Sequence, residues 1–385
     1  MDSRQVLSTF NGMRDYKHKV RLSDVRVNRR SRWLVNKTLK AGRLASGTAV
    51  LQFEEAVRKL AGAKHFAAVS NGTSALALAL RTTSLRPGEE VITTPFTFGA
   101  TWNAILSSGA ALRIVDINQD DFNMNLSLLP SRINSRTRVV VPVHLYGLMC
   151  DLPELRRIVE TRGIRIVEDC AQALGATSKG IGAGVTDIGT FSFYATKNLT
   201  TGEGGGISCA SPEDVRKIQL LRNQGFINRY EYELLGENHR MTDVAACIGL
   251  GAIEGYGAQL ASRRANAKYL TEGLSGLSQL YVPKVPDGRE HVWHQFTVVL
   301  ASGNLDQRDS FSNHLASRGI ESGIYYPRPL YDYQCFRHHP MVILDEPTPV
   351  ADRVSRSCIS IPVHPRLTKG DLDRIIESIH EFFPR

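Results

Sequence analysis

Short β-rich runs alternate with helix-length segments from residue 65 to about residue 210, and this alternation limits the possible folds more than any other feature of the sequence. The expected strands are residues 65–70, 90–93, 112–116, 138–143 and 164–168, and the expected helices between them are residues 74–85, 101–108 and 152–161. Such an order predicts right-handed crossovers and a mostly parallel sheet. We therefore expect an α/β fold.

The carboxyl ends of these strands are where a ligand is expected, because open α/β sheets bind their ligands outside that edge. Asn71, Pro95, His144 and Asp169 each follow one of the expected strands closely. We expect these four residues to border one site.

The chain has 385 residues, which is long enough for about two or three domains. Helical periodicity resumes over residues 213–224 and 243–274, and the Pro-rich residues 282–287 resemble a linker. The remaining strand-like and helical segments suggest a smaller α+β domain: residues 295–300, 306–317 and 369–383. We place the boundary near residues 255 to 285, with a large domain of residues 1–255 and a small C-terminal domain of residues 256–385.

The formal net charge of +9 lies in one segment. Residues 1–43 hold twelve Lys and Arg against three Asp and Glu, and the rest of the chain is balanced at 35 of each. A neutral body argues against nucleic acid binding as the main function. The basic segment is interpreted as a solvated arm or a subunit contact, and an anionic substrate or polyanion is the alternative.

Other features of the sequence concern its cellular location. The six cysteines have no C-x-x-C spacing and several stand in apolar runs, which predicts reduced, structural thiols and no metal ion. The N-terminus lacks a signal-peptide apolar region, and no run approaches 18 apolar residues. We expect a cytoplasmic protein that has no membrane partner.

Two residues suggest a specific chemistry. Asp169 follows an apolar strand in Glu168-Asp-Cys-Ala-Gln172, and Lys197 lies in a Thr/Gly-rich loop after the apolar strand of residues 188–193. Pyridoxal 5'-phosphate requires such a pair, because it forms a Schiff base with an amine and needs a carboxylate beside its pyridine nitrogen. Taken singly, Asp169 could cap a turn and Lys197 could be a solvated surface charge.

The turn Asn71-Gly72-Thr73-Ser74 lies between an expected strand and an expected helix. The backbone N–H groups of Gly72 and Thr73 and the hydroxyls of Thr73 and Ser74 could face a phosphate there. The same turn could simply cap the helix. Neither G-x-x-x-x-G-K-[ST] nor G-x-G-x-x-G occurs, so a nucleotide-hydrolysing or nicotinamide enzyme has no motif in this chain.

Several segments resemble, in their order along the chain, the DegT-type (DegT/DnrJ/StrS) family of sugar aminotransferases. The resemblance extends from about Val35 to about Asp373 and depends on these segments: Asn71-Gly-Thr-Ser-Ala-Leu76, Pro95-Phe-Thr-Phe98, Pro142-Val-His-Leu-Tyr-Gly147, Glu168-Asp-Cys-Ala-Gln172, Ser192-Phe-Tyr-Ala-Thr-Lys197, Gly202-Glu-Gly-Gly205, Gly236-Glu-Asn-His-Arg240 and Tyr326-Pro-Arg-Pro-Leu330. It implies a fold-type I pyridoxal-phosphate-dependent transferase, with a mostly parallel sheet in a large domain and a smaller C-terminal α+β domain.

The resemblance also implies roles for individual residues. Lys197 is expected to bind the cofactor covalently and, once freed, to move the proton, while Asp169 is expected to hold the pyridinium proton. The expected cofactor contacts are Gly72, Thr73, Ser74 and Ser192 at the phosphate, Gln172 at the ring hydroxyl, Phe98 on the ring face, and Asn238 from the neighbouring subunit of a homodimer.

Two residues are expected on the substrate side, and each has an open alternative. Arg240 could face the substrate, or the turn from Asn238 to Arg240 could be only a polar turn before a helix. Tyr331 stands where many family members carry histidine, which leaves the sugar contacts open, and Cys170 stands where alanine is usual. Lys197 argues against the family's deoxygenating branch, in which histidine replaces this lysine.

The function that the resemblance implies is an aminotransferase that moves an amino group from an amino acid, expected to be glutamate or glutamine, to a keto-sugar, expected to be nucleotide-linked, in sugar or antibiotic biosynthesis. The alternative among enzymes is an aminotransferase or synthase that acts on a carbocyclic ketone of the aminocyclitol or aminobenzoate type. The alternative from another class is a pyridoxal-phosphate-binding regulator or nucleic-acid-binding protein that uses the basic segment.

Overall fold

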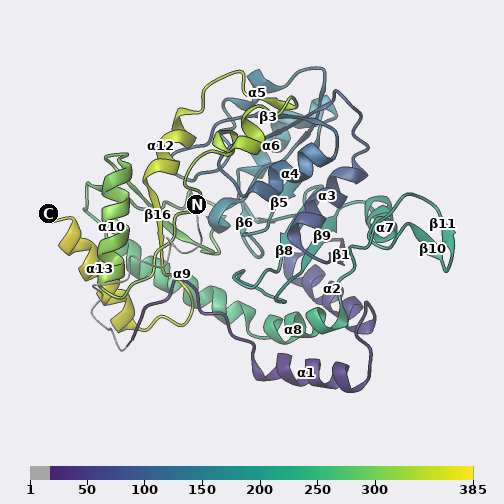
Figure 1. The fold of residues 1–385 in the computed structure, drawn as a ribbon, viewed down its shortest axis with the longest axis horizontal. Helices are drawn as coiled ribbons and strands as arrows, with labels where there is room; N and C mark the ends of the chain where they lie inside the picture. Colours follow the sequence, from purple (N-terminus) through teal and green to yellow (C-terminus); the bar gives the residue numbers. More distant parts are fainter. Residues whose placement is uncertain (1–17, 385) are drawn as a thin grey trace.

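The computed structural model describes residues 18–384 and is built around one eight-stranded sheet (Figure 1). In spatial order its strands are β1 (His65–Val69), β9 (Gly205–Cys209), β8 (Ile188–Ser192), β5 (Arg165–Asp169), β4 (Thr137–Val140), β2 (Glu90–Thr93), β3 (Ala111–Ile114) and β15 (Val342–Ile343). From β8 to β15 every neighbouring pair is parallel, whereas β9 is antiparallel to both β1 and β8. The predicted α/β class with a mostly parallel sheet is confirmed.

Helices cover both faces of this sheet, because alternate side chains of each buried strand point to opposite faces. One face packs against α3 (Gly72–Thr82), α4 (Gly99–Ser107) and α7 (Pro212–Leu221). The other face packs against α2 (Thr48–Ala61), α6 (Leu152–Val159) and α8 (Asp243–Ile253). In β1, for example, Val69 packs on the face covered by α3, and Phe66 packs on the face covered by α2.

The loops before these helices carry the polar residues that start them. The side chain of Asn71 accepts a hydrogen bond from the backbone N–H of Ser74 and caps α3, and Asp151 caps α6 by accepting from Glu154. α3 begins three residues after the last residue of β1. This places the first turn of α3 at the edge where the ligand was predicted.

A second core lies toward the C-terminus, beyond α9 (Tyr256–Gly273). It contains the antiparallel sheet of β12 (Leu280–Tyr281), β14 (Phe296–Leu300) and β16 (Cys358–Ile361), together with α10 (Leu305–Ser317) and α13 (Lys369–Phe382). Val20 joins this core, and β15, at residues 342–343, joins the large sheet. The boundary at residues 255/256 remains a prediction.

The other elements are short or peripheral. They are α12 (Pro349–Ser357), α5 (Leu129–Arg132), α11 (Gln334–Arg337), the 3₁₀ turns Leu145–Gly147, Glu160–Arg162 and Leu330–Asp332, the sheet of β6 (Thr177–Ser178), β7 (Ile181–Gly182) and β13 (Arg289–Glu290), and the hairpin of β10 (Phe226–Asn228) and β11 (Glu231–Tyr232). The hairpin projects at the right of Figure 1. The six cysteines are all free thiols, as predicted.

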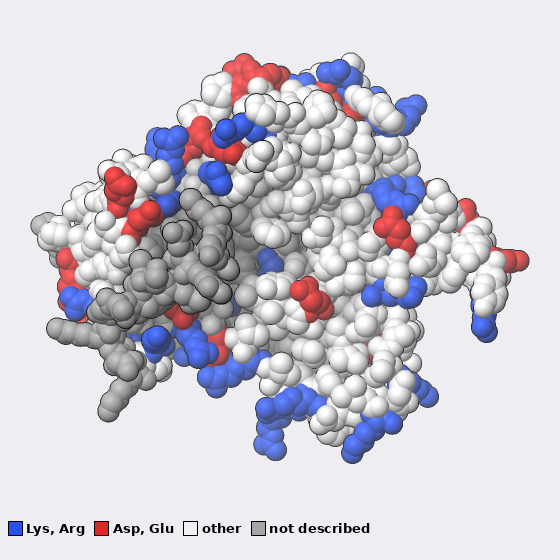
Figure 2. Space-filling model, in the orientation of Figure 1, with Lys and Arg blue, Asp and Glu red and all other residues white. Residues whose placement is uncertain are grey.

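The basic segment includes a helix that the sequence reasoning did not predict. Its residues 1–17 lie outside the described residues, and α1 (Arg29–Lys40) packs on α8, where the hydroxyl of Ser31 donates to the carbonyl of Ile248 at 2.8 Å. Lys and Arg side chains gather along the lower edge of the molecule, where α1 lies (Figure 2).

Helical periodicity was predicted over residues 243–274. The structure contains two helices there, α8 and α9, which meet at an angle of 60°. Among residues 18–384 no single helix has the length and apolar character needed to cross a membrane, and only α8 and α9 taken together meet those criteria.

Candidate active site

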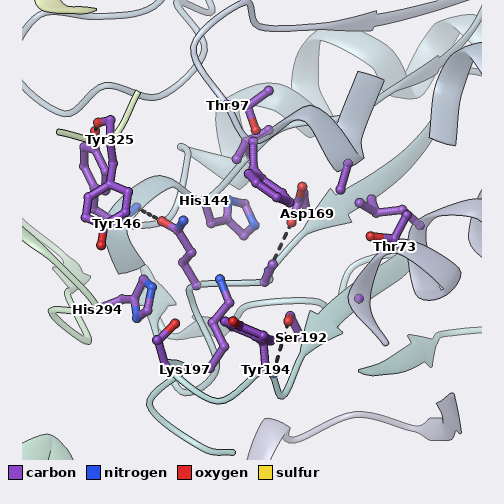
Figure 3. A pocket seen from close by; sticks show the side chains of 18 of the residues that line it. Thr73, Thr97, His144, Tyr146, Asp169, Ser192, Tyr194, Lys197, His294 and Tyr325 are labelled. Atoms are coloured by element: carbon purple, nitrogen blue, oxygen red, sulfur yellow. Dashed lines mark hydrogen bonds between the residues drawn. The ribbon is translucent and has the colours of Figure 1, made fainter. Parts of the chain in front are cut away.

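A cavity of about 440 Å³ opens at the carboxyl edge of the large sheet (Figure 3). Residues that follow β1, β2, β4, β5 and β8 all contribute to its wall, as the strand order predicts. Tyr325, Tyr326 and His294 close it from the C-terminal part of the chain. The large sheet and the C-terminal part of the chain thus both contribute to the cavity wall.

Asp169 ends β5 and is 6% exposed. Its Oδ2 accepts a hydrogen bond from the hydroxyl of Thr101 at 2.8 Å, and its Oδ1 accepts from the backbone N–H of Ala171 at 3.1 Å. Two donors therefore hold the carboxyl group of Asp169 in one position at the end of β5.

Lys197 extends into the same cavity from the loop after β8. The backbone N–H of Lys197 donates to the carbonyl of Tyr194 at 2.9 Å, which fixes the turn that presents the side chain. Burial lowers the pKa of Lys197 from 10.5 to about 8, although the negative charge of Asp169 acts in the opposite direction. The amine is therefore mostly protonated at pH 7, but its unprotonated, nucleophilic form is far more populated there than for a lysine of ordinary pKa.

The first turn of α3 forms another part of the cavity wall. Gly72 and Thr73 lie at its N-terminal end, where backbone N–H groups have no partner inside the helix, and Ser192 at the end of β8 faces them. A Cβ atom on Gly72 would lie only 2.8 Å from Cβ of Ser192. Glycine is therefore needed for the close approach of these two segments.

The structure brings most of the predicted residues together. Gly72, Thr73, Phe98, Asp169, Gln172, Ser192 and Lys197 all line the cavity. The amide of Gln172 accepts from the backbone N–H of Tyr146 at 2.6 Å and donates to the hydroxyl of Tyr326 at 3.2 Å. The ring of Phe98 is 64% exposed, so it is not a core residue.

Four predicted residues do not line this cavity. The hydroxyl of Ser74 is occupied by Ser70 and His239, at 3.2 and 3.0 Å, because the first turn of α3 directs it away from the cavity. Tyr331 packs beside the core of α3 and α4 and hydrogen-bonds with Thr348. Asn238 is exposed, and Arg240 donates to Asn223 at 2.9 Å. The expected contacts of Ser74, Tyr331 and Arg240 stay predictions, and Asn238 was expected to act on a neighbouring subunit.

Sequence reasoning missed several wall residues. The tyrosines at positions 146, 194, 325 and 326 are all part of the wall, as is His294. Tyr146 and the pair Tyr325-Tyr326 stood within or beside the quoted segments, so their side chains were candidates that the reasoning passed over. His294 had no comparable signal, because it belongs to a segment 97 residues after Lys197.

His144, Glu168 and Cys170 form a buried group whose atoms lie close enough to surround a metal ion. Their hydrogen bonds are already made within the protein: Nδ1 of His144 accepts from the backbone of Cys150 at 3.2 Å and Nε2 donates to Glu168 at 2.9 Å, while Glu168 also accepts from Gly184 at 2.8 Å. We interpret this group as a hydrogen-bond network that supports the end of β5.

The donor set of the cavity fits pyridoxal phosphate. It provides one amine with a lowered pKa, one fixed carboxylate, and a helix N-terminus beside a serine hydroxyl. These groups match an aldehyde, a ring nitrogen and a phosphate respectively. Lys197, Asp169, and Gly72 with Thr73 and Ser192 would hold those three parts.

Comparison with known proteins gives consistent results. The family model described as the DegT/DnrJ/EryC1/StrS aminotransferase family matches residues 27–380. A UDP-N-acetyl-3-dehydro-alpha-D-glucosamine 3-aminotransferase of Acidithiobacillus ferrooxidans is 38% identical, over 84% of this chain and 85% of its own length.

Two solved structures show the same fold over nearly the whole chain. DesV of S. venezuelae superposes with a TM-score of 0.88 at 31% identity, covering 92% of this chain and 94% of that chain. The PLP-form of Spr1654, a putative sugar aminotransferase from Streptococcus pneumoniae, superposes with a TM-score of 0.87 at 28% identity, covering 95% and 98%.

Proposed function

Because this chain belongs to the DegT/DnrJ/EryC1/StrS aminotransferase family and is therefore a pyridoxal-phosphate-dependent enzyme, we propose that it transfers an amino group from an amino acid to a nucleotide-linked keto-sugar. The observation that carries this proposal is the presence of Lys197 and Asp169 in one cavity, opposite the first turn of α3. The name of the Acidithiobacillus ferrooxidans relative supports the class of acceptor.

When it is bound, pyridoxal phosphate supplies a carbonyl group that reacts with amines and a ring that withdraws electrons from the bond being broken. Asp169 would hold a proton on the ring nitrogen. Lys197 would hold the cofactor through Nζ and, as a free amine, would move a proton at Nζ. Gly72, Thr73 and Ser192 would bind the phosphate through N–H and O–H donors.

The burial of the cavity supports the proton transfer. Burial lowers the pKa of Lys197 to about 8, so that the amine can both take up and release a proton near neutral pH. The aromatic side chains of Phe98, Tyr146, Tyr194 and Tyr326 line the same cavity.

The acceptor can be identified with the amine form of the purified enzyme. Glutamate or glutamine is first used to convert the cofactor to its amine form, and 3-keto and 4-keto nucleotide sugars are then added singly, with a carbocyclic ketone as the comparison. Return of the absorbance of the aldehyde form identifies an acceptor. If only the carbocyclic ketone restores it, the keto-sugar proposal is wrong. The expected cytoplasmic location stays a prediction.

We also propose a homodimer whose active sites are shared. Asn238 is exposed and lies outside the cavity of its own chain, which leaves it available to a second copy. An isologous two-fold interface would then give each site Lys197 from one chain and Asn238 from the other.

Mixed dimers test this arrangement. Lys197→Ala and Asn238→Asp should each be inactive, the second because a carboxylate would be placed against the phosphate. In randomly paired dimers of the two variants about one quarter of all sites carry neither change, so about a quarter of the activity should return. If mixed dimers that contain cofactor stay inactive, Asn238 does not act across the interface.

A further inference from the structure

His294 lines the cavity beside Lys197 and has no role in the chemistry described so far (Figure 3). It lies in the segment that leads into β14 and is 7% exposed. The backbone on either side of it is anchored, because Val292 donates to the carbonyl of Gly147 at 3.0 Å and Gln295 donates to that of Tyr146 at 3.2 Å. The imidazole is therefore held at a fixed place in the wall.

Asn198 determines which nitrogen of His294 carries the hydrogen. Nδ2 of Asn198 donates to the backbone carbonyl of Val292 at 3.0 Å, and because a carbonyl can only accept, the amide has only this orientation. Oδ1 of Asn198 then faces Nδ1 of His294 at 3.4 Å, and an amide oxygen can also only accept. Nδ1 must therefore be the N–H, and Nε2 carries a lone pair.

That lone pair is available to the cavity. Among residues 18–384, no hydrogen-bond partner is found for Nε2 of His294. Nε2 is accessible to solvent, because the buried side-chain atoms without a partner in that part of the chain all belong to other residues. Because His294 lines the cavity, the accessible space around Nε2 is the cavity itself.

Burial and two neighbouring cationic side chains keep His294 neutral. Lys197 faces it from the loop after β8 and Arg263 from α9, whereas the neighbouring His291 is itself buried with its pKa lowered to about 3. Arg263 is 8% exposed and donates to the carbonyl of Trp293 at 2.9 Å. Burial, followed by these neighbours, holds the pKa of His294 well below its ordinary value.

We propose that Nε2 of His294 is a fixed hydrogen-bond acceptor for the substrate, which binds an O–H or N–H group that enters the cavity close to Lys197. A neutral imidazole in this tautomer cannot donate at Nε2, so Nε2 does not bind carboxylate or phosphate oxygens. The group it binds is either a hydroxyl of the keto compound or the ammonium of the amino donor. The identity of the substrate rests on the proposed function, whereas the tautomer does not.

The tautomer can be measured without any turnover. Nitrogen NMR of the full-length protein labelled with ¹⁵N-histidine, with cofactor bound, should show His294 as the neutral Nδ1–H form throughout the neutral pH range. The signal is assigned by its loss in His294→Gln. A protonated ring, or an N–H at Nε2, would overturn the proposal even if no substrate were known.

A matched pair of variants tests the contact with the substrate. His294→Leu fills a similar volume without an acceptor, and His294→Gln places an amide oxygen near the position of Nε2. Each half-reaction is followed in a single turnover, from the aldehyde to the amine form with the donor and back with the acceptor. His294→Leu should slow one half-reaction by at least about tenfold, and His294→Gln should recover most of that rate.

The half-reaction that slows identifies the group. A slow acceptor half-reaction indicates a sugar hydroxyl, and a slow donor half-reaction indicates the ammonium. The proposal is wrong if His294→Leu matches the wild-type rate in both half-reactions. It is also wrong if His294→Gln is as slow as His294→Leu, because an acceptor at this position would then not increase the rate. A wild type that shows no turnover with any ketone would count against the proposed function instead.

Asn198→Asp gives an independent test through pH. A carboxylate beside Nδ1 stabilises the imidazolium, in which Nε2 becomes a donor, so NMR should show protonation of His294 at mildly acidic pH. The half-reaction that His294→Leu slows should then decline on the acid side in this variant and not in the wild type. Protonation without that decline contradicts the substrate contact, and absence of protonation contradicts the assigned position of Asn198.

Discussion

Replacement of Lys197 by methionine should stabilise the cofactor-free protein, although it removes the residue that we propose binds the cofactor. The pKa of this amine is lowered from 10.5 to about 8, chiefly by burial, which means that the folded state holds the charged amine unfavourably. The lowering corresponds to about 3 kcal/mol, and to about 2 to 3 kcal/mol once water in the cavity is allowed for. Methionine has a similar length and no charge, so it should relieve most of this unfavourable term.

The pH dependence has a defined sign. Below pH 8 the amine is protonated in both the folded and unfolded states, so the full unfavourable term is present. Between pH 8 and 10.5 the unfolded state keeps a proton that the folded state has lost, so the wild type gains stability as the pH rises. The advantage of Lys197→Met should therefore be largest at pH 7 and decrease toward pH 10.

Urea denaturation of the cofactor-free wild type and variant at pH 7 and at pH 10 measures this difference. Lys268→Met is the control, because Lys268 is 78% exposed beside Glu272, and its replacement should change stability by less than about 0.5 kcal/mol. If Lys197→Met is no more stable than the wild type at pH 7, or if its advantage is unchanged at pH 10, then the amine is not held in a buried and unfavourable state.

Two further substitutions test other parts of the cavity. Asp169→Asn can keep its oxygen on the N–H of Ala171 and turn its amide toward Thr101, so the fold should persist while turnover falls at least about tenfold, and near-normal turnover would leave Asp169 as a turn cap. Gly72→Ala places a Cβ atom 2.8 Å from Cβ of Ser192, so fluorescence titration should show at least about tenfold weaker cofactor binding, and unchanged affinity would mean that no phosphate lies there.

Strand and helix alternation allowed most of the large sheet to be predicted, and with it the place of the cavity. Asp169 ends β5 and Asn71 precedes α3, as the local pattern indicated, because strand ends and helix caps are encoded by neighbouring residues. The order of the strands in the sheet could not be predicted in the same way. Neither β9 between β1 and β8 nor β15 at the other edge could be predicted, because pairing between distant segments leaves no local signal.

The glycines after Lys197 show the same limit. Gly202 has a positive φ of 85°, a conformation that glycine adopts readily in turns. Gly205 and Gly206, however, belong to β9, where added Cβ atoms would meet the backbone of Asn71 at 2.3 Å and the ring of Phe66 at 2.1 Å. These glycines permit packing between segments of the protein, which the sequence alone does not reveal.

Three of the cavity residues that sequence reasoning missed come from the C-terminal part of the chain. Tyr325, Tyr326 and His294 line the cavity although they lie far from Lys197 in the sequence. Their separation from Lys197 along the chain gives no indication that they reach the cavity. The hydrogen bond between the hydroxyl of Ser74 and His239 could not be predicted for a related reason, since His239 is 165 residues away.

The central claim is that Lys197 carries the cofactor, and reductive labelling tests it most directly. Borohydride treatment of the purified holoenzyme should fix a pyridoxyl group on a single lysine, and peptide mass mapping should place it on Lys197, the lysine that lines the cavity with Asp169. A label on any other lysine, or a holoenzyme that cannot be labelled, would contradict the account.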